Sequence, residues 1–303
     1  MNSLNLFAPC TYQGAKKRLS NQIVNYLINL SDNVSNTKFY DLCCGSGVVT
    51  IELLNRGIKP SQIIMCDKSS YGKFWNSVGA GTFDMDKFFK YSKQVPRNKE
   101  LVQDYIKKLS KYSADIDEEY IYILLQACSF GGKQIWKENG RWKNPTFRNY
   151  WKPTEYSNRR SPVNPMVPEI DTLEQRVANI VTACKGLTCY NTDIFDMIDI
   201  IKNDDSLKII YIDPPYINTA GYGFNFNHQQ FINVLKTITD CPILLSEYQI
   251  FSEVCVTLNI LGAKGGISGN RDRQITEYLN FYNVDINKIN NLVKPRFTKK
   301  KLF

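Results

Sequence analysis

The sequence predicts an α/β fold of the Rossmann-like, doubly wound kind, with a mostly parallel sheet, an antiparallel edge and an inserted, mainly helical region that carries a hairpin. Two observations lead to this prediction. Short apolar runs typical of buried strands alternate with segments that have helical spacing. Two of these runs end directly at Gly45-Ser46-Gly47 and at Asp213-Pro214-Pro215-Tyr216, and loops at strand ends are where such sheets bind ligands.

The first regular elements form the start of the sheet. Apolar residues recur at helical spacing over residues 19–30, which predicts an amphipathic helix. Apolar runs over 38–43 and 62–66 then predict two buried strands, with a helix over 48–56 between them. This alternation indicates parallel strands covered on both faces.

The pattern changes between residues 75 and 168, where lysine, tyrosine and polar residues dominate. Helices are predicted over 99–112 and 118–128, with no strand between them. An insertion explains this change most simply. We therefore expect one domain formed by residues 1–74 and 169–303, interrupted by a second domain over 75–168.

The chain is predicted to return to the sheet through a helix over 174–183. Strands follow over 187–190, 208–212 and 242–245. Residues 274–282 alternate enough to form a last strand, which we expect to be an antiparallel edge.

Composition narrows the class of protein. The chain has 303 residues, a formal net charge of +9 and a mean hydropathy of −0.33, and the positive charge favours a polyanionic partner. No run reaches the roughly 18 uninterrupted apolar residues of a membrane helix, and no secretory signal pattern is present, so we expect a cytoplasmic protein. Nine scattered cysteines without a CxxC pair and a single histidine, His228, argue against a metal site or a His-based triad.

Asp213-Pro214-Pro215-Tyr216 carries the most chemical information. Two prolines stiffen the backbone and contribute no N–H, so the Asp213 carboxylate and the neighbouring carbonyls form a fixed set of acceptors. Such acceptors suit an amino group, and Tyr216 offers a flat face beside them. The pattern is typical of a site for a nucleobase taken out of its stack.

The glycine loop points to a nucleoside-containing ligand. Gly45 and Gly47 would let a ligand approach the backbone, whereas Thr50 stands where a dinucleotide fingerprint has its third glycine, which argues against a bound pyrophosphate. Asp67 ends the next strand and is suited to ribose hydroxyls. Taken alone, these residues would equally form a glycine turn and a strand-terminal aspartate.

These motifs, in this order, resemble those of the S-adenosylmethionine-dependent DNA adenine-N6 methyltransferases of the Dam-like (alpha) group, including phage-type members. The resemblance implies methyl transfer from S-adenosylmethionine to the N6 amine of adenine in duplex DNA after base flipping. It makes residues 1–74 and 169–303 the catalytic domain and 75–168 the target recognition domain. The catalytic residues it implies are Asp213, Pro214, Pro215 and Tyr216, and the cofactor-binding residues are Tyr12, Gly14, Lys16, Asp41, Cys43, Gly45, Gly47, Asp67, Asp193 and Ile194.

The resemblance also implies roles within these sets. Asp213 would accept one amine hydrogen and the Pro214 carbonyl the other, while Tyr216 stacks on the base. Lys16 would pair with the methionine carboxylate, and Tyr12 would pack over it.

Residues 130–145 resemble the hairpin with which Dam-like enzymes touch DNA. A gapless alignment places Ile135 where readers of GATC carry an arginine, and isoleucine cannot make a bidentate contact to a base, which predicts another target. A solvated basic hairpin with an aromatic mini-core is the alternative. The expected contacts to phosphates and bases are Phe130, Lys133, Lys137, Arg141, Trp142, Lys143 and Arg148.

Other activities fit the same motifs. Methylation of RNA adenine or of cytosine N4 needs the same acceptors, and a catalytically silent DNA-binding protein could retain the fold. We expect a monomer that acts on double-stranded DNA in a bacterial cell or a phage-infected host.

Overall fold

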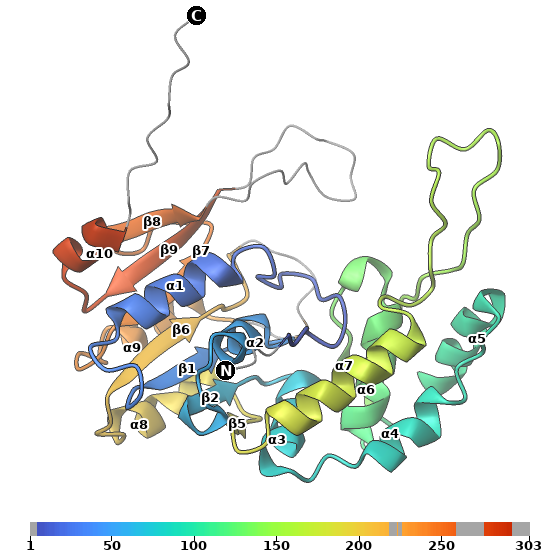
Figure 1. Ribbon diagram of the computed structural model, residues 1–303, viewed down its shortest axis with the longest axis horizontal. Helices are drawn as coiled ribbons and strands as arrows, with labels where there is room; N and C mark the ends of the chain where they lie inside the picture. Colours follow the sequence, from blue (N-terminus) through green and yellow to red (C-terminus); the bar gives the residue numbers. More distant parts are fainter. Residues whose placement is uncertain (1–4, 218–222, 224–225, 259–275, 293–303) are drawn as a thin grey trace, which may run out of the picture.

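The chain folds around a seven-stranded mixed sheet with helices on both faces (Figure 1). The computed structural model describes residues 5–217, 223, 226–258 and 276–292. Within them the strand order is β5-β2-β1-β6-β7-β9-β8. The strands of this sheet are β1 (Lys38–Leu42), β2 (Ile63–Cys66), β5 (Thr188–Tyr190), β6 (Lys208–Ile212), β7 (Ile243–Glu247), β8 (Val254–Leu258) and β9 (Glu277–Tyr282).

Alternate residues of the central strands serve two separate hydrophobic clusters, because successive side chains of a strand point to opposite faces. Phe39 and Tyr211 pack with α1, α2 and α3, whereas Tyr40 and Ile210 pack with α8 and α9. This is the doubly wound arrangement that the sequence predicts. The helices are α1 (Ser20–Leu30), α2 (Val48–Asn55), α3 (Ser70–Ala80), α4 (Met85–Ser92), α5 (Lys99–Leu109), α6 (Glu118–Cys128), α7 (Ile170–Ala183), α8 (Met197–Lys202), α9 (His228–Leu235) and α10 (Ile286–Leu292).

The sheet is parallel from β5 to β7 and antiparallel beyond, which confirms the predicted fold class. The predicted position of the last strand is wrong. β9 pairs with β7 on one side and with β8 on the other, so β8, which periodicity did not reveal, forms the edge. Pairing such as that of Leu244 with Phe281 joins distant segments, and local spacing carries no information about it. Residues 274 and 275 lie outside the described residues.

The inserted helices share their interior with the sheet. Residue 75, the expected start of the second domain, falls inside α3, and both Phe74 and Trp75 are fully buried. Their cluster also contains Phe39 of the sheet and Ile121 of α6. Nearly every residue of α6 is buried, as expected of a helix surrounded by other helices.

A short hairpin and a long loop follow α6. The hairpin consists of β3 (Trp136–Glu138) and β4 (Arg141–Lys143). Residues 152–162 then form a loop that extends away from the body of the molecule (Figure 1), and backbone hydrogen bonds between Trp151 and Val163 close its base. None of the helices in the described residues has the length and apolar character needed to cross a membrane.

Candidate active site

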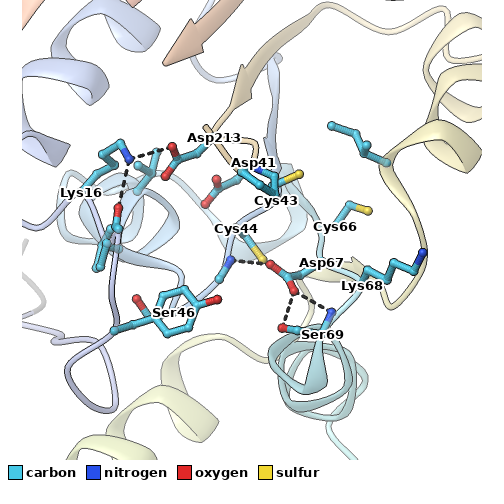
Figure 2. A pocket seen from close by; sticks show the side chains of 18 of the residues that line it. Lys16, Asp41, Cys43, Cys44, Ser46, Cys66, Asp67, Lys68, Ser69 and Asp213 are labelled. Carbon is cyan, nitrogen blue, oxygen red and sulfur yellow. Dashed lines mark hydrogen bonds and ion pairs between the residues drawn. The ribbon is translucent and has the colours of Figure 1, made fainter. Parts of the chain in front are cut away.

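A cavity opens at the carboxyl ends of β1, β2 and β6. This is the switch point of a doubly wound sheet, because β2 and β6 lie on opposite sides of β1. The cavity has a volume of about 910 Å³, including the solvent-open space at its mouth. Lys16 and Asp213 lie toward one end of it, and Asp67, Lys68 and Ser69 lie toward the other (Figure 2).

The structure brings together almost all of the residues that the resemblance assigns to the cofactor. Of the residues expected to bind the cofactor, Gly47 is the one that does not line the cavity. Of the four residues expected to be catalytic, Asp213 and Pro215 line it. Tyr216 lines an adjoining groove instead, together with Tyr248 and Glu277. The expected cofactor-binding residues that line the cavity are Tyr12, Gly14, Lys16, Asp41, Cys43, Gly45, Asp67, Asp193 and Ile194.

The glycine loop is held between two aromatic rings. Gly45 and Gly47 have φ angles of +49° and +71°, in the left-handed region. A Cβ on Gly45 would lie 2.9 Å from the ring of Tyr12, and a Cβ on Gly47 would lie 2.3 Å from the ring of Trp75. The Trp75 indole also donates a hydrogen bond to the Gly45 carbonyl at 3.0 Å. Close packing within the protein therefore requires both glycines.

Asp41 and Thr50 connect β1 to α2. The Asp41 carboxylate accepts hydrogen bonds from the backbone N–H of Thr50 at 3.1 Å and from its hydroxyl at 2.7 Å. The threonine that replaces the third glycine of the fingerprint thus has a structural partner. Burial raises the pKa of Asp41 to about 7, although both bonds from Thr50 act in the opposite direction.

Asp67 is fixed at the far end of the cavity. One carboxylate oxygen accepts from the backbone N–H of Gly45 at 2.7 Å, and the other accepts from the backbone N–H of Ser69 at 2.8 Å and from its hydroxyl at 2.5 Å. A carboxylate has about four acceptor positions, so one remains for a ligand hydroxyl. Burial raises the pKa of Asp67, and these hydrogen bonds lower it.

Two further polar groups line the cavity. The Ser46 hydroxyl is buried and has no hydrogen-bond partner within the described residues. The carboxylate of Asp193 pairs with the Lys68 ammonium at 2.8 Å and also accepts from the backbone N–H of Phe195. An unpartnered buried hydroxyl and a positioned carboxylate suit a polar ligand such as a nucleoside.

At the other end, Asp213 continues the line of β6. Its backbone N–H donates to the Leu42 carbonyl at 3.1 Å, so the ladder between β1 and β6 fixes where the loop after β6 begins. Its side chain is 19% exposed and forms an ion pair with the Lys16 ammonium, with 2.7 Å between Nζ and Oδ1. The Lys16 ammonium also donates to the Gly14 carbonyl at 3.0 Å and lies 3.6 Å from Glu277.

Three neighbouring elements hold the rest of the loop. The Tyr216 hydroxyl donates to Glu277 of β9 at 2.7 Å, and the Ile217 backbone N–H donates to Glu247 of β7 at 3.3 Å. His228, the first residue of α9, forms a hydrogen bond with the Pro215 carbonyl at 2.5 Å. The tetrapeptide is thus positioned by tertiary contacts as well as by its prolines.

The Asp213 end of the cavity concentrates buried negative charge. Burial raises the pKa of Asp213 and that of Glu277, and the charge of Lys16 lowers both. Burial also raises the pKa of Glu247 to about 7. For Lys16, burial by itself lowers the pKa, but the charges of Asp213 and Glu277 raise it above its ordinary value.

The residues expected to touch DNA divide into two groups. Phe130, Lys133 and Arg141 are exposed. By contrast, the Trp142 side chain is 5% exposed and stacks near Tyr122 at 6.1 Å between ring centroids. Its burial favours the alternative, an aromatic mini-core, at that position.

Two of the remaining side chains expected to contact DNA form ion pairs within the protein. Lys137 pairs with Glu118 at 2.6 Å, and Lys143 pairs with Glu138 at 3.1 Å. Arg148 is half-buried, and its Nη1 atom lacks a hydrogen-bond partner in the described part of the chain. Ile135 is fully buried, so its side chain cannot reach a base edge.

Sequence reasoning missed several residues of the site. Glu247 and Glu277 accept hydrogen bonds from the loop after β6, and the only signal for them was a charged residue at the last or first position of a strand. Gln134 lines the cavity and accepts from the backbone N–H of Gly223. The described residues contain no group of three or more histidine, cysteine, aspartate or glutamate side chains placed to hold a metal ion.

Comparison with known proteins gives a family match. A family model described as D12 class N6 adenine-specific DNA methyltransferase matches residues 12–261, which is most of the chain. No curated protein sequence matches the chain. Among solved structures, the rRNA methyltransferase aviRa from Streptomyces viridochromogenes is similar over 97% of this chain and 91% of that chain, with a TM-score of 0.38 and 10% sequence identity. A similarity that low carries no argument about function.

Proposed function

The chain belongs to the D12 class of N6 adenine-specific DNA methyltransferases, and from that premise we propose which of its residues carry the reaction. The enzyme transfers a methyl group from S-adenosylmethionine to the N6 amine of adenine in DNA. We propose that Asp213 and the Pro214 carbonyl receive that amine, and that the adjoining cavity binds the cofactor. The carrying observation is the Asp213 carboxylate, which the β1–β6 ladder holds at one end of a cavity that Asp67 bounds at the other.

The residues present fit the cofactor. The free acceptor position of Asp67 suits a ribose hydroxyl, and Asp193, which lines the same cavity, is proposed to accept from the adenine amine of the cofactor. The unpartnered hydroxyl of Ser46 supports a polar ligand in this cavity. Tyr12 packs against the glycine loop and lines the same cavity. When bound, S-adenosylmethionine supplies an activated methyl group on a sulfonium centre.

The chain's own residues would prepare the substrate amine. The lone pair of the adenine amine is delocalised into the ring, so the amine becomes nucleophilic when acceptors draw on its hydrogens. Asp213 would accept one hydrogen at its carboxylate and the Pro214 carbonyl would accept the other. Fixed acceptors and correct positioning act together, and proximity alone can lower a barrier by about 7–11 kcal/mol.

The base must leave the helix to reach these groups. Asp213 lies within the cavity with 19% of its side chain exposed, beyond the reach of a base that remains stacked. Tyr216 is proposed to stack on the flipped base, a contact worth about 1–3 kcal/mol. Tyr248 lines the same groove, with its ring 4.5 Å from that of Tyr216 and at 80° to it.

Residues 75–168 are proposed to recognise the target. Exposed Lys133 and Arg141 suit phosphates, and exposed Phe130 suits a base or sugar face. The loop over residues 152–162 adds Arg159 and Arg160, both exposed. Because Ile135 is buried, we propose a target sequence other than GATC.

Methyl transfer from labelled S-adenosylmethionine tests the catalytic assignment. We expect duplex DNA to become labelled, with N6-methyladenine as the modified nucleoside, and Asp213→Asn to abolish labelling while it still binds the cofactor. Asp205→Asn, at an exposed position, should behave like the wild type. Equal labelling by Asp213→Asn would refute the role of Asp213. N4-methylcytosine, or labelling of RNA in preference to DNA, would refute the substrate.

We also propose that the enzyme is of the phage type, lies in the cytoplasm and is a monomer. A monomer is supported by the scatter of exposed large apolar side chains, such as Phe7, Leu101 and Ile250, over separate elements. Light scattering of the purified protein tests it, and a dimer mass at micromolar concentration would refute it.

A further inference from the structure

The Lys16 ammonium lies where an amine substrate would need to bind. Its side chain is 6% exposed, and Nζ lies 2.7 Å from the Asp213 carboxylate and 3.0 Å from the Gly14 carbonyl. It also lies 4.5 Å from the centre of the Tyr216 ring. A carboxylate, a carbonyl and an aromatic face are the groups that the proposed reaction uses to hold the adenine amine. Lys16 therefore presents an N–H donor to the same acceptor.

We propose that Lys16 is a positioning residue for methyl transfer: its ammonium keeps the Asp213 carboxylate ionised, shares that carboxylate with the adenine amine, and passes to Glu277 as the amine binds. The proposal rests on the proposed function, in which Asp213 is the amine acceptor. It assigns Lys16 this role in place of pairing with the cofactor's methionine carboxylate.

The charges around Asp213 explain why a cation is needed there. Burial favours the protonated form of a carboxyl group, and so do neighbouring negative charges. A protonated Asp213 would be a weaker acceptor for an amine hydrogen. Lys16 is the cation that pairs with Asp213. The titratable groups that face Asp213 are Lys16 from the N-terminal segment, Asp41 and Cys43 at the end of β1, Tyr211 on β6, Tyr216 after it, Glu247 and Tyr248 at the end of β7, and Glu277 on β9.

Glu277 gives Lys16 a second counter-ion nearby. Its carboxylate is buried, accepts the Tyr216 hydroxyl at 2.7 Å and lies 3.6 Å from Nζ. A movement of Nζ by about 1 Å would bring that pair to hydrogen-bond distance. The ammonium can thus yield a position on Asp213 without becoming a buried, unpaired charge, which would be costly.

A cofactor-anchoring role and a positioning role predict different kinetics. If Lys16 chiefly holds the cofactor carboxylate, Lys16→Met weakens cofactor binding at every pH. If Lys16 keeps Asp213 ionised, the same substitution moves the acid limb of the kcat profile to higher pH, and cofactor binding changes little. Lys16→Arg retains the positive charge and should restore the position of the acid limb.

The test uses the full chain, with kcat measured against pH at saturating S-adenosylmethionine and duplex DNA, and with the cofactor Kd measured by calorimetry. We expect Lys16→Met to shift the acid limb upward by about one pH unit, which lowers kcat about tenfold below the limb and leaves it nearly unchanged above it. The cofactor Kd should change less than about threefold, which corresponds to about 0.65 kcal/mol. An unshifted limb, or a loss confined to the cofactor Kd, overturns the proposal.

Two further variants make the outcome decisive. Glu277→Gln removes the second counter-ion, so the adenine amine must compete with a more firmly held Lys16, and KM for DNA should rise. Glu277→Asp retains the negative charge near Lys16 and serves as the matched control for that step. Thermal unfolding of each variant checks that it is folded. If Asp213→Asn is inactive but Lys16→Met leaves the acid limb of the kcat profile in place, the role of Lys16 is refuted and the proposed function stands. If Asp213→Asn is active, both the role of Lys16 and the proposed function are refuted.

Discussion

The hydroxyl of Tyr216 donates a hydrogen bond to the carboxylate of Glu277 at 2.7 Å, across 61 residues of sequence. The bond joins the loop after β6 to the first residue of β9. Since β9 lies between β7 and β8, the antiparallel side of the sheet contributes to the position of the loop after β6.

Removal of this hydroxyl should destabilise the protein. Tyr216→Phe leaves a buried carboxylate with one partner fewer, and hydrogen bonds to charged groups contribute about 1.5–3 kcal/mol. We expect the free energy of unfolding to fall by about that amount in urea titrations. Tyr112→Phe, at an exposed ring, is the control and should change nothing measurable. Equal stability of the two variants would show that the bond contributes little.

Gly47 and Gly57 offer a matched test of the glycine loop. Both have positive φ angles, +71° and +88°, so alanine is strained at either position. Only at Gly47 would the new Cβ meet the Trp75 ring, because nothing lies within 4 Å of a Cβ on Gly57. Gly47→Ala should therefore cost about 1–3 kcal/mol more than Gly57→Ala in urea unfolding. Similar losses in the two variants would argue against steric contact with Trp75.

The buried carboxylate of Asp41 should make stability depend on pH. Burial raises its folded-state pKa from 3.8 to about 7, so the folded state holds a proton that the unfolded state releases. The contribution of Asp41 to the free energy of unfolding is therefore fully present at low pH and is lost as pH rises from about 4 to about 7. Asp41→Asn cannot ionise and can still accept from Thr50, so it should gain stability relative to the wild type as pH rises, by at most about 4 kcal/mol.

Urea unfolding at several pH values measures that difference. Asp205→Asn, an exposed substitution, provides the baseline. A stability difference between Asp41→Asn and the wild type that stays constant across this pH range would contradict the raised pKa.

Salt dependence of DNA binding tests the proposed phosphate contacts. The slope of log K against log salt changes by about 0.9 for each phosphate that the protein no longer neutralises. Lys133→Ala and Arg141→Ala should each reduce the slope by about that amount. Lys202 is the last residue of α8 and precedes β6, so it lies near the amino ends of the strands, whereas the cavity lies at their carboxyl ends. Lys202→Ala should therefore leave the slope unchanged. An unchanged slope in Lys133→Ala or Arg141→Ala would remove that residue from the interface.

The sequence was sufficient for the parts of the fold that depend on local periodicity. The helix over α6 and the strands β1, β2 and β6 lie close to their expected ranges, because burial imposes a period on the residues themselves. The order of β7, β9 and β8 could not be predicted, because it depends on pairing between distant segments.

Some features of the candidate site could likewise be predicted from the sequence, and others could not. The motifs of Asp67 and Asp213 follow strands, so their meeting at one edge of a parallel sheet could be expected. The ion pair between Lys16 and Asp213 could not, because it depends on the path of an irregular N-terminal segment. Trp142 is another such case: the sequence shows an aromatic residue in a short hairpin, but not that its ring faces α6 and the interior.

The hydrophobic cluster that runs from the sheet into α6 limits how this enzyme can be altered. A chimera cut at residues 74 and 75 would divide α3 between two fully buried aromatic rings and pair each half with a foreign interior. If the hairpin reads the target, as proposed, an exchange of specificity between relatives would therefore require α3 and α7 to be transferred together with it. Under the proposal that residues 75–168 recognise the target, a new target would be reached more readily by substitutions at the exposed surface than by recombination.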